Sequence, residues 1–299
     1  MNALAAHGLG KRYGEHWALR NCSLEVPAGR VVGLVGPNGA GKTTLLQLAV
    51  GLLAPSTGTI EVLGLAPGKS REALARVGFV AQDAPLYPDF TVGETLTIGR
   101  RLNERWNQDW AERRLAGLSI PLEKPVGQLS GGQRAQVALV LALGKQPELV
   151  LLDEPVARLD PLARREFLQS LLDAAVEHGL TVVLSSHLIS DLERTCDFLI
   201  LLRDAEVRLS GAIDDLVERH RLLVGPRGRS TAGAGIARTI RESHTDKQST
   251  LLVETAGPVG DPAWESHVVD LEELVLAYLG EPNEPRRPVD VLHRVEARA

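Results

Sequence analysis

Apolar residues occur in short, nearly continuous runs along much of the chain, separated by polar and helix-favouring stretches. Runs of this kind are typical of buried strands in a parallel sheet, and they predict strands at 31–35, 149–152, 180–184 and 198–202. A helix is expected from about 161 to 177, between the second and third of these strands. The alternation of strand and helix predicts an α/β fold with a mainly parallel sheet that helices cover on both faces.

The segment from 83 to about 146 differs from the strand-rich parts on either side of it. Charged residues and tryptophans recur there in an amphipathic pattern, so we expect an inserted helical subdomain. Before this segment, 18–26, 59–63 and 77–80 predict further strands. The first two are expected to be partly exposed, because polar residues stand among their apolar ones.

The composition changes again after about residue 221, where glycine, alanine, threonine and proline become frequent. These residues favour loops, so we expect a linker or long loop as far as residue 249. A strand at 251–254 and an apolar helix at 270–278 then predict a small accessory segment. The proline- and arginine-rich residues 281–299 are expected to be mobile.

The overall composition is that of a globular chain, and its length allows one large or two modest domains. The change near residue 221 divides it into an expected domain at 1–220 and a smaller C-terminal part at 221–299. The chain's 299 residues are 44% hydrophobic, enough for a sizeable core. A formal net charge of −5 gives no electrostatic case for nucleic acid, and no such partner is expected. The longest fully apolar run, 137–143, is far below the roughly 18 residues that indicate a membrane span. We therefore expect any membrane role to depend on a partner.

A glycine-rich stretch follows the apolar run 31–35 and precedes a helix-favouring run, which is the order strand, loop, helix. It matches G-x-x-x-x-G-K-[ST], and we expect nucleotide to bind at Gly36, Pro37, Asn38, Gly39, Ala40, Gly41, Lys42, Thr43 and the following Thr44. The glycines let successive backbone N–H groups face one anion at the positive end of the helix dipole. Lys42 is expected to reach the β- and γ-phosphates of the nucleotide, and the Thr43 hydroxyl to ligate Mg²⁺. A glycine turn that matches by chance is the alternative.

Two carboxylates, Asp153 and Glu154, end the buried strand 149–152. Ligands of open α/β sheets bind at the carboxyl ends of the strands, so both residues are expected beside the glycine loop. We expect Asp153 to hold Mg²⁺ through water and Glu154 to polarise the attacking water. A solvated strand end is the alternative, and the glycine loop makes it the weaker one.

A third motif precedes another helical run and reads Leu129-Ser130-Gly131-Gly132-Gln133. Ser130 is a favourable N-cap residue, and the glycines expose the first backbone N–H groups of the helix. The motif therefore predicts a second anion-binding helix start. Taken alone, it also fits an ordinary capped helix.

Together, the three motifs resemble those of the ATP-binding subunit of ATP-binding-cassette (ABC) transporters, whose signature sequence is LSGGQ. The resemblance covers about residues 4–220 and keeps the family's order of motifs. It implies a P-loop NTPase core with a mainly parallel sheet, an antiparallel β subdomain and an inserted helical subdomain, followed by a small C-terminal accessory segment. It also implies ATP and Mg²⁺ as cofactors, and ATP hydrolysis that drives transport.

The resemblance extends to single residues outside these motifs. It places Tyr13 against the adenine ring, Gln82 on Mg²⁺ or the attacking water, and His187 on the γ-phosphate. Asp160 matches the loop that links the two sites of a dimer in the family. Taken alone, Tyr13 fits surface packing, and His187 fits an ordinary surface or core histidine.

The family arrangement also implies partners. In a head-to-tail dimer, Ser130, Gly131 and Gly132 of one subunit close over ATP held by Lys42 of the other. The second ATP-binding subunit is either identical or different, and both act on an integral membrane permease at the cytoplasmic face of the cell membrane. The loop 82–90 is expected to form part of the permease docking surface.

Two other functions stay open on the sequence alone. One is a soluble cassette ATPase that acts on ribosomes or DNA, against which the single cassette and the lack of a heptad run argue. The other is a regulatory module that binds ATP without hydrolysis, against which Glu154 and His187 argue. Gln136, Leu141 and Arg158 depart from residues common in the family, and the sequence does not indicate the cargo.

Overall fold

The computed structural model describes residues 1–228 and 235–280, and the expected mobility of 281–299 lies outside these residues. The chain divides into two compact units, unit 1 (1–210) and unit 2 (211–299). The division falls inside strand β9 (Glu206–Ala212), about ten residues before the boundary expected near 220.

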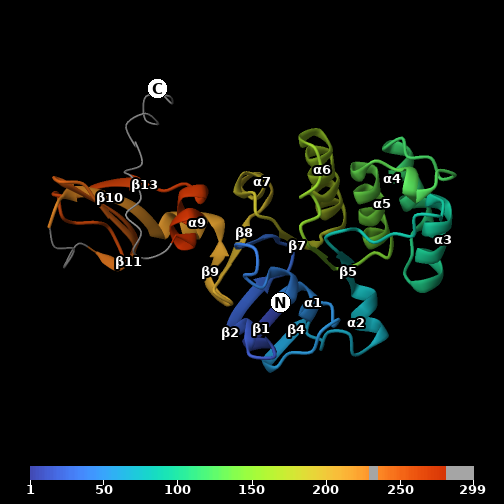
Figure 1. Ribbon diagram of the computed structural model, residues 1–299, viewed down its shortest axis with the longest axis horizontal. Coiled ribbons are helices and arrows are strands. Elements are labelled where there is room, and N and C mark those ends of the chain that lie inside the picture. Colours follow the sequence, from blue (N-terminus) through green and yellow to red (C-terminus); the bar gives the residue numbers. More distant parts are fainter. Residues whose placement is uncertain (229–234, 281–299) are drawn as a thin grey trace. The chain divides into compact units, whose positions relative to one another are not determined.

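The centre of unit 1 is a six-stranded sheet in the order β5-β6-β7-β3-β8-β9 (Figure 1). Its strands before β9 are β3 (Val31–Val35), β5 (Val77–Val80), β6 (Leu149–Leu152), β7 (Thr181–Ser185) and β8 (Phe198–Arg203). The strands from β5 to β8 run parallel, and β6 and β7 are buried along their whole length. The predicted parallel sheet is confirmed.

A second sheet of unit 1 is antiparallel, with the order β2-β1-β4. It confirms the two partly exposed strands, β2 (His16–Pro27) and β4 (Thr57–Val62). Its central strand, β1 (Asn2–Tyr13), was not predicted. Register shifts interrupt the pairing of β1 with β2, so the buried residues of β1 do not alternate strictly, and the sequence pattern conceals the strand.

Helices lie on both sides of the parallel sheet, with α6 and α7 on one side and α1 on the other (Figure 1). Their bounds, with that of α2, are α1 (Lys42–Ala49), α2 (Arg71–Arg76), α6 (Pro161–His178) and α7 (Ile189–Thr195). The α6 helix matches its prediction because both ends carry clear signals. Asp160 caps its first turn, and Gly179 ends it in the left-handed conformation.

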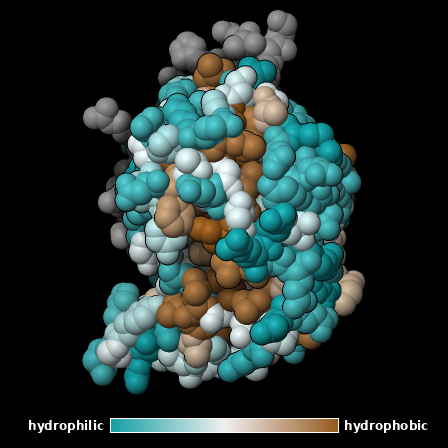
Figure 2. Space-filling model, turned by 90° about the vertical axis from the view of Figure 1, so that its right-hand side faces the viewer, coloured by the Kyte–Doolittle hydropathy of each residue, from teal (hydrophilic) through white to brown (hydrophobic). Residues whose placement is uncertain are grey.

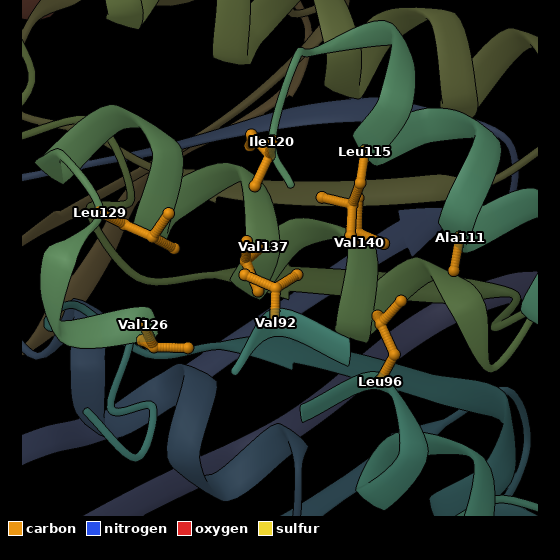
Figure 3. Close-up of a cluster of buried hydrophobic side chains, with 9 residues drawn as sticks. All are labelled: Val92, Leu96, Ala111, Leu115, Ile120, Val126, Leu129, Val137 and Val140. Carbon is orange, nitrogen blue, oxygen red and sulfur yellow. The ribbon is translucent and has the colours of Figure 1, made fainter. Parts of the chain in front are cut away.

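The helices expected between 83 and 146 are α3 (Val92–Leu102), the 3₁₀ turn η1 (Val126–Gln128), α4 (Gln108–Gly117) and α5 (Gly131–Gly144). They enclose an apolar cluster of their own, drawn in Figure 3: Val92, Leu96, Ala111, Leu115, Ile120, Val126, Leu129, Val137 and Val140. The indole of Trp106 packs so closely on two glycines that a Cβ on Gly99 or Gly144 would lie 2.7 Å from it. Close packing on Trp106 thus fixes the spacing of α3 and α5.

Unit 2 contains a four-stranded antiparallel sheet in the order β11-β12-β10-β13. Its elements are β10 (His220–Pro226), β11 (Ile236–His244), β12 (Gln248–Thr255), β13 (Glu265–Val268), α8 (Ile213–Arg219) and α9 (Leu271–Leu279). The strand expected at 251–254 and the helix expected at 270–278 are present. The linker expected from 221 to 249 is wrong for β10 and β11, because both strands pair with β12, a contact that local composition does not reveal.

A buried histidine joins the sheet of unit 2 to its helices. The Nδ1 atom of His220 lies 2.6 Å from the carbonyl oxygen of Leu216, and Nε2 lies 2.9 Å from the Tyr278 hydroxyl. A carbonyl only accepts, so Nδ1 donates, and neutral Nε2 accepts from Tyr278. Burial lowers the pKa of His220, so the unfolded chain binds the proton more readily. The stabilisation of unit 2 by neutral, hydrogen-bonded His220 is therefore lost as the pH falls below about 6.5.

We predict that Tyr278→Phe loosens unit 2, because it removes the donor to a buried acceptor. Such a loss costs about 1–3 kcal/mol, which corresponds to roughly 5- to 150-fold faster amide exchange in β10 and α9 where exchange requires opening. Hydrogen–deuterium exchange read on peptides from these elements measures it. The control is Tyr87→Phe, since Tyr87 is 69% exposed. Equal exchange in the two variants would contradict the role of the Tyr278 hydroxyl.

Candidate functional site

The glycine loop runs from the end of β3 to the start of α1 and packs tightly on neighbouring backbone. A Cβ on Gly36 would lie 2.3 Å from the carbonyl oxygen of Leu202, and one on Gly41 would lie 2.3 Å from that of Ala18. Gly41 is also the N-cap of α1, with a φ of 103°. Only glycine fits these two positions, and a glycine cap leaves the first N–H groups of α1 available to an anion.

Lys42 begins α1, and only 5% of it is exposed. Its ammonium donates to the carbonyl oxygens of Gly36 (2.8 Å) and Pro37 (3.3 Å), and it lies 3.3 Å from Oε1 of Glu154. A buried ammonium requires partners of this kind, because burial removes its hydration. The contact joins the glycine loop to the acidic pair that ends β6.

Asp153 and Glu154 follow β6 directly and share one partner, Ser185. The Ser185 hydroxyl lies 2.9 Å from Oδ1 of Asp153, and the backbone N–H of Glu154 donates to the same hydroxyl oxygen at 2.8 Å. Asp153 is buried. Glu154 has a φ of 45°, in the left-handed region that residues with side chains rarely adopt. Such backbone conformations cluster at functional sites.

His187 completes a chain of contacts across the site. Its Nδ1 lies 3.2 Å from Oε2 of Glu154, while Oε1 of the same carboxylate faces Lys42. The Glu154 side chain is 12% exposed and that of His187 is 48% exposed. One nearly buried carboxylate therefore links a buried cation to an imidazole that solvent reaches.

A cavity of about 660 Å³ lies over these groups, lined by His16, Ala18, Asn38, Gly39, Gly41, Lys42, Thr43, Thr44, Gln82, Glu154 and His187. Its loop N–H groups and the Lys42 ammonium are suitable donors for phosphate oxygens. The Thr43 hydroxyl, the Gln82 amide and the carboxylate of nearby Asp153 are oxygen donors of the kind that Mg²⁺ prefers. The residues present thus fit a nucleotide phosphate chain and its metal ion.

Tyr13 does not line this cavity, but it lies on the β1–β2 hairpin, as does the lining residue His16. It pairs with His16 across the hairpin and is 48% exposed, with the Lys11 ammonium 5.4 Å from its ring centre. His16 and Ala18, which do line the cavity, were not predicted. The cross-strand pairing of Tyr13 with His16 is the signal that locates them, and it requires knowing that β1 is a strand.

The signature residues Ser130, Gly131, Gly132 and Gln133 are absent from the lining of the cavity. They form the start of α5, where the Ser130 hydroxyl accepts from the N–H of Gln133 and the Gln133 side chain accepts from the N–H of Ser130. Asp160 likewise lies outside the cavity, as the N-cap of α6. The structure therefore brings together the glycine loop, Gln82, the acidic pair and His187, and leaves the signature elsewhere in the same chain.

Comparison with known proteins shows which family the chain belongs to. The family model described as ABC transporter matches residues 19–157. The chain is 39% identical over 219 residues to the Nod factor export ATP-binding protein I of Burkholderia orbicola (strain AU 1054), an alignment that covers 70% of each protein. The chain belongs to the ATP-binding subunits of ABC transporters.

Solved structures agree with this assignment. One is an ATP binding subunit of an ABC transporter, at 27% identity and a TM-score of 0.65, which covers 72% of this chain and 92% of that one. Another is cbiO1 from Clostridium perfringens, part of the ABC transporter complex cbiONQ, at 28% identity and a TM-score of 0.62, which covers 71% of this chain and 88% of that one. The family resemblance and the predicted P-loop fold are confirmed.

The chain is thus an ATP-binding subunit with transport-coupled ATPase activity. The relatives named above are transport proteins, which leaves the soluble alternative acting on ribosomes or DNA without support. Among the described residues, no helix combines the length and apolar character needed to cross a membrane.

We predict that Lys42→Ala impairs ATP binding and lowers ATP turnover by at least 10-fold, because the phosphate charge loses its buried counter-charge. Steady-state ATPase rates at saturating Mg-ATP and equilibrium binding of a fluorescent ATP analogue test it. The control is Lys69→Ala, which removes an ammonium from an exposed position. Equal turnover in the Lys42 variant and the parent would refute the assignment of Lys42.

Proposed function

We propose that this subunit hydrolyses Mg-ATP at a site that a second ATP-binding subunit completes, and that closure of the pair drives a membrane permease. The observation that carries the proposal is the chain of contacts from Lys42 through Glu154 to His187 beneath the cavity. This chain of contacts supports a site at which the Glu154 carboxylate meets a phosphate and a water molecule.

The proposal gives each residue of the site one role. The N–H groups from Gly39 to Thr44 bind the phosphates, and Lys42 offsets the charge of the β- and γ-phosphates. Thr43, Gln82 and Asp153 hold Mg²⁺, which when bound stabilises the charge that develops on the transferred phosphoryl group.

The remaining roles concern water, charge and the base. Glu154 polarises the attacking water, and its presence in the lining of the cavity supports this role. His187 contacts the γ-phosphate, and Gln82 also contacts the attacking water. Tyr13, exposed on its hairpin, stacks on adenine.

The position of the signature supports a second subunit. Ser130 and Gly131 are exposed at the start of α5 and lie outside the cavity of their own chain. Ser130, Gly131, Gly132 and Gln133 therefore act on ATP bound by another subunit, identical or different, and Asp160 lies at the interface of the two. The N–H groups of a second helix start then face the γ-phosphate.

A second cavity supports docking to a permease. It measures about 590 Å³, and its lining is mostly apolar, with Leu52, Leu74, Phe79, Pro85, Leu86 and Leu141 among its residues. Figure 2 shows apolar residues gathered near the centre of the side where α2, α3 and α4 lie. Tyr87 and Phe90 stand exposed nearby in sequence, with ring centres 5.2 Å apart. An apolar hollow with exposed aromatics suits an interface with an integral membrane protein at its cytoplasmic face.

We predict that Glu154→Gln stops hydrolysis but still allows an ATP-bound dimer to form. The amide keeps the size of the carboxylate but is a very poor base, so turnover falls by at least 100-fold while phosphate binding persists. Adding Ser130→Arg places bulk and charge at the second helix start and abolishes the dimer.

Size-exclusion chromatography with light scattering, with and without Mg-ATP, distinguishes these outcomes. The control for the second substitution is Ser119→Arg, at an exposed position in the same subdomain. A Glu154→Gln protein that binds ATP but stays monomeric at high concentration would exclude the identical dimer and favour a different second subunit.

We predict that cysteines placed at Leu86 or Tyr87 form cross-links to an integral membrane protein in membranes of the native host. The reason is the apolar character of this loop and of the cavity beside it. Val176→Cys on α6, 85% exposed, is the control and should capture none. Capture by Val176→Cys alone would place the docking surface elsewhere.

A further inference from the structure

We propose that Ser185 is a positioning residue for ATP hydrolysis, whose single hydroxyl orients both carboxylate residues, Asp153 and Glu154. The inference rests on the proposed function of the site and adds a residue to it. Ser185 is the last residue of β7 and is completely buried. A buried hydroxyl is costly unless it is hydrogen-bonded, and this one is bonded on both sides.

The direction of each hydrogen bond follows from the groups involved. A carboxylate only accepts and a backbone N–H only donates. The Ser185 hydroxyl therefore donates its proton to Oδ1 of Asp153 (2.9 Å) and accepts from the N–H of Glu154 (2.8 Å). The two bonds close a ring through the backbone between Asp153 and Glu154, so one oxygen atom holds both residues.

At Asp153, the bond restrains rotation of the carboxylate. Oδ1 is fixed to Ser185, and Oδ2 is the oxygen that Ser185 does not engage. Mg²⁺ requires near-ideal octahedral geometry, so its affinity depends on how firmly each ligand is oriented. Residues that orient a metal ligand are typically worth 10- to 100-fold in metal affinity or activity.

At Glu154, the bond restrains the backbone. The residue holds a φ of 45°, and unfavourable conformations of this kind persist only where the surroundings enforce them. A change in φ is a rotation about the N–Cα bond of Glu154, and it would move the backbone N–H relative to the rest of the residue. The hydrogen bond to Ser185 holds this N–H in place. The carboxylate of Glu154 is thereby kept between Lys42 and His187.

The sheet topology explains why this position can act on both residues. Strand β7 lies between β6, which ends at the acidic pair, and β3, which leads into the glycine loop. Leu184 pairs with Leu152 of β6, and Ser185 pairs with Leu34 of β3. A side chain at the end of β7 thus stands at the junction of the two motifs.

The test compares Ser185→Ala with Thr181→Ala at the other end of the same strand. Thr181 is also buried, and its hydroxyl accepts from a backbone N–H, that of Gly29, at 2.9 Å. Both variants lose a buried hydroxyl, but only one loses a contact with the acidic pair. The measurements are kcat and KM for Mg-ATP, and the affinity for a fluorescent ATP analogue in EDTA and across a Mg²⁺ titration.

We expect Ser185→Ala to lower kcat by about 10- to 100-fold with little change in KM. In the Mg²⁺ titration, more Mg²⁺ should be needed to strengthen nucleotide binding. Nucleotide binding in EDTA should be unchanged. Thr181→Ala should keep the parent kcat and Mg²⁺ response, and Ser185→Thr, which retains the hydroxyl, should restore both. Should Ser185→Ala not fold, Ser185→Cys replaces it, since a thiol is a weak donor and acceptor, and the same losses are expected.

Equal kcat and equal Mg²⁺ response in the Ser185 and Thr181 variants would overturn the role of Ser185. In that case, Mg²⁺-dependent hydrolysis by the parent and its loss in Lys42→Ala would leave the proposed function standing. A parent that hydrolyses no Mg-ATP would overturn both.

Discussion

The Lys42 ammonium is buried among two backbone carbonyls and one carboxylate, and this arrangement requires separate parts of the chain to meet. The glycine loop must curl back so that Gly36 and Pro37 face the ammonium. Strand β6 must end where Glu154 can reach it. An unpaired buried charge costs several kcal/mol. The burial of Lys42 is therefore favourable only when the two carbonyls and the carboxylate are all in place. The same set of contacts positions His187, through the second oxygen of Glu154.

Much of this site follows from the sequence, because its motifs are local and each stands at a strand end. Parallel strands bring their carboxyl ends to one edge, which is why Lys42, Glu154 and His187 converge although they are far apart in the chain. Ser185 and His16 were not predicted, because their roles depend on which strand lies beside which. That order is a property of the sheet and not of any single segment.

The fold shows the same division between local and non-local information. Buried strands with continuous apolar runs and helices with clear caps were predicted within a few residues. Strand β1 was missed because register shifts break its alternation, and β10 and β11 were missed because glycine and proline at the strand ends suggested a loop. Pairing with β12 stabilises β10 and β11 despite that composition.

The packing of Trp106 on Gly99 and Gly144 holds the C-terminal end of α5, so a tilt of this helix would turn about that end. Gly144 ends this helix, which is 14 residues long, and the signature lies at its other end. At 1.5 Å per residue this helix is about 20 Å long, so a tilt of only about 3° about its C-terminal end moves the signature end by roughly 1 Å. A methyl group added at Gly144 acts at the end of α5 opposite the signature, yet the signature would undergo the largest displacement.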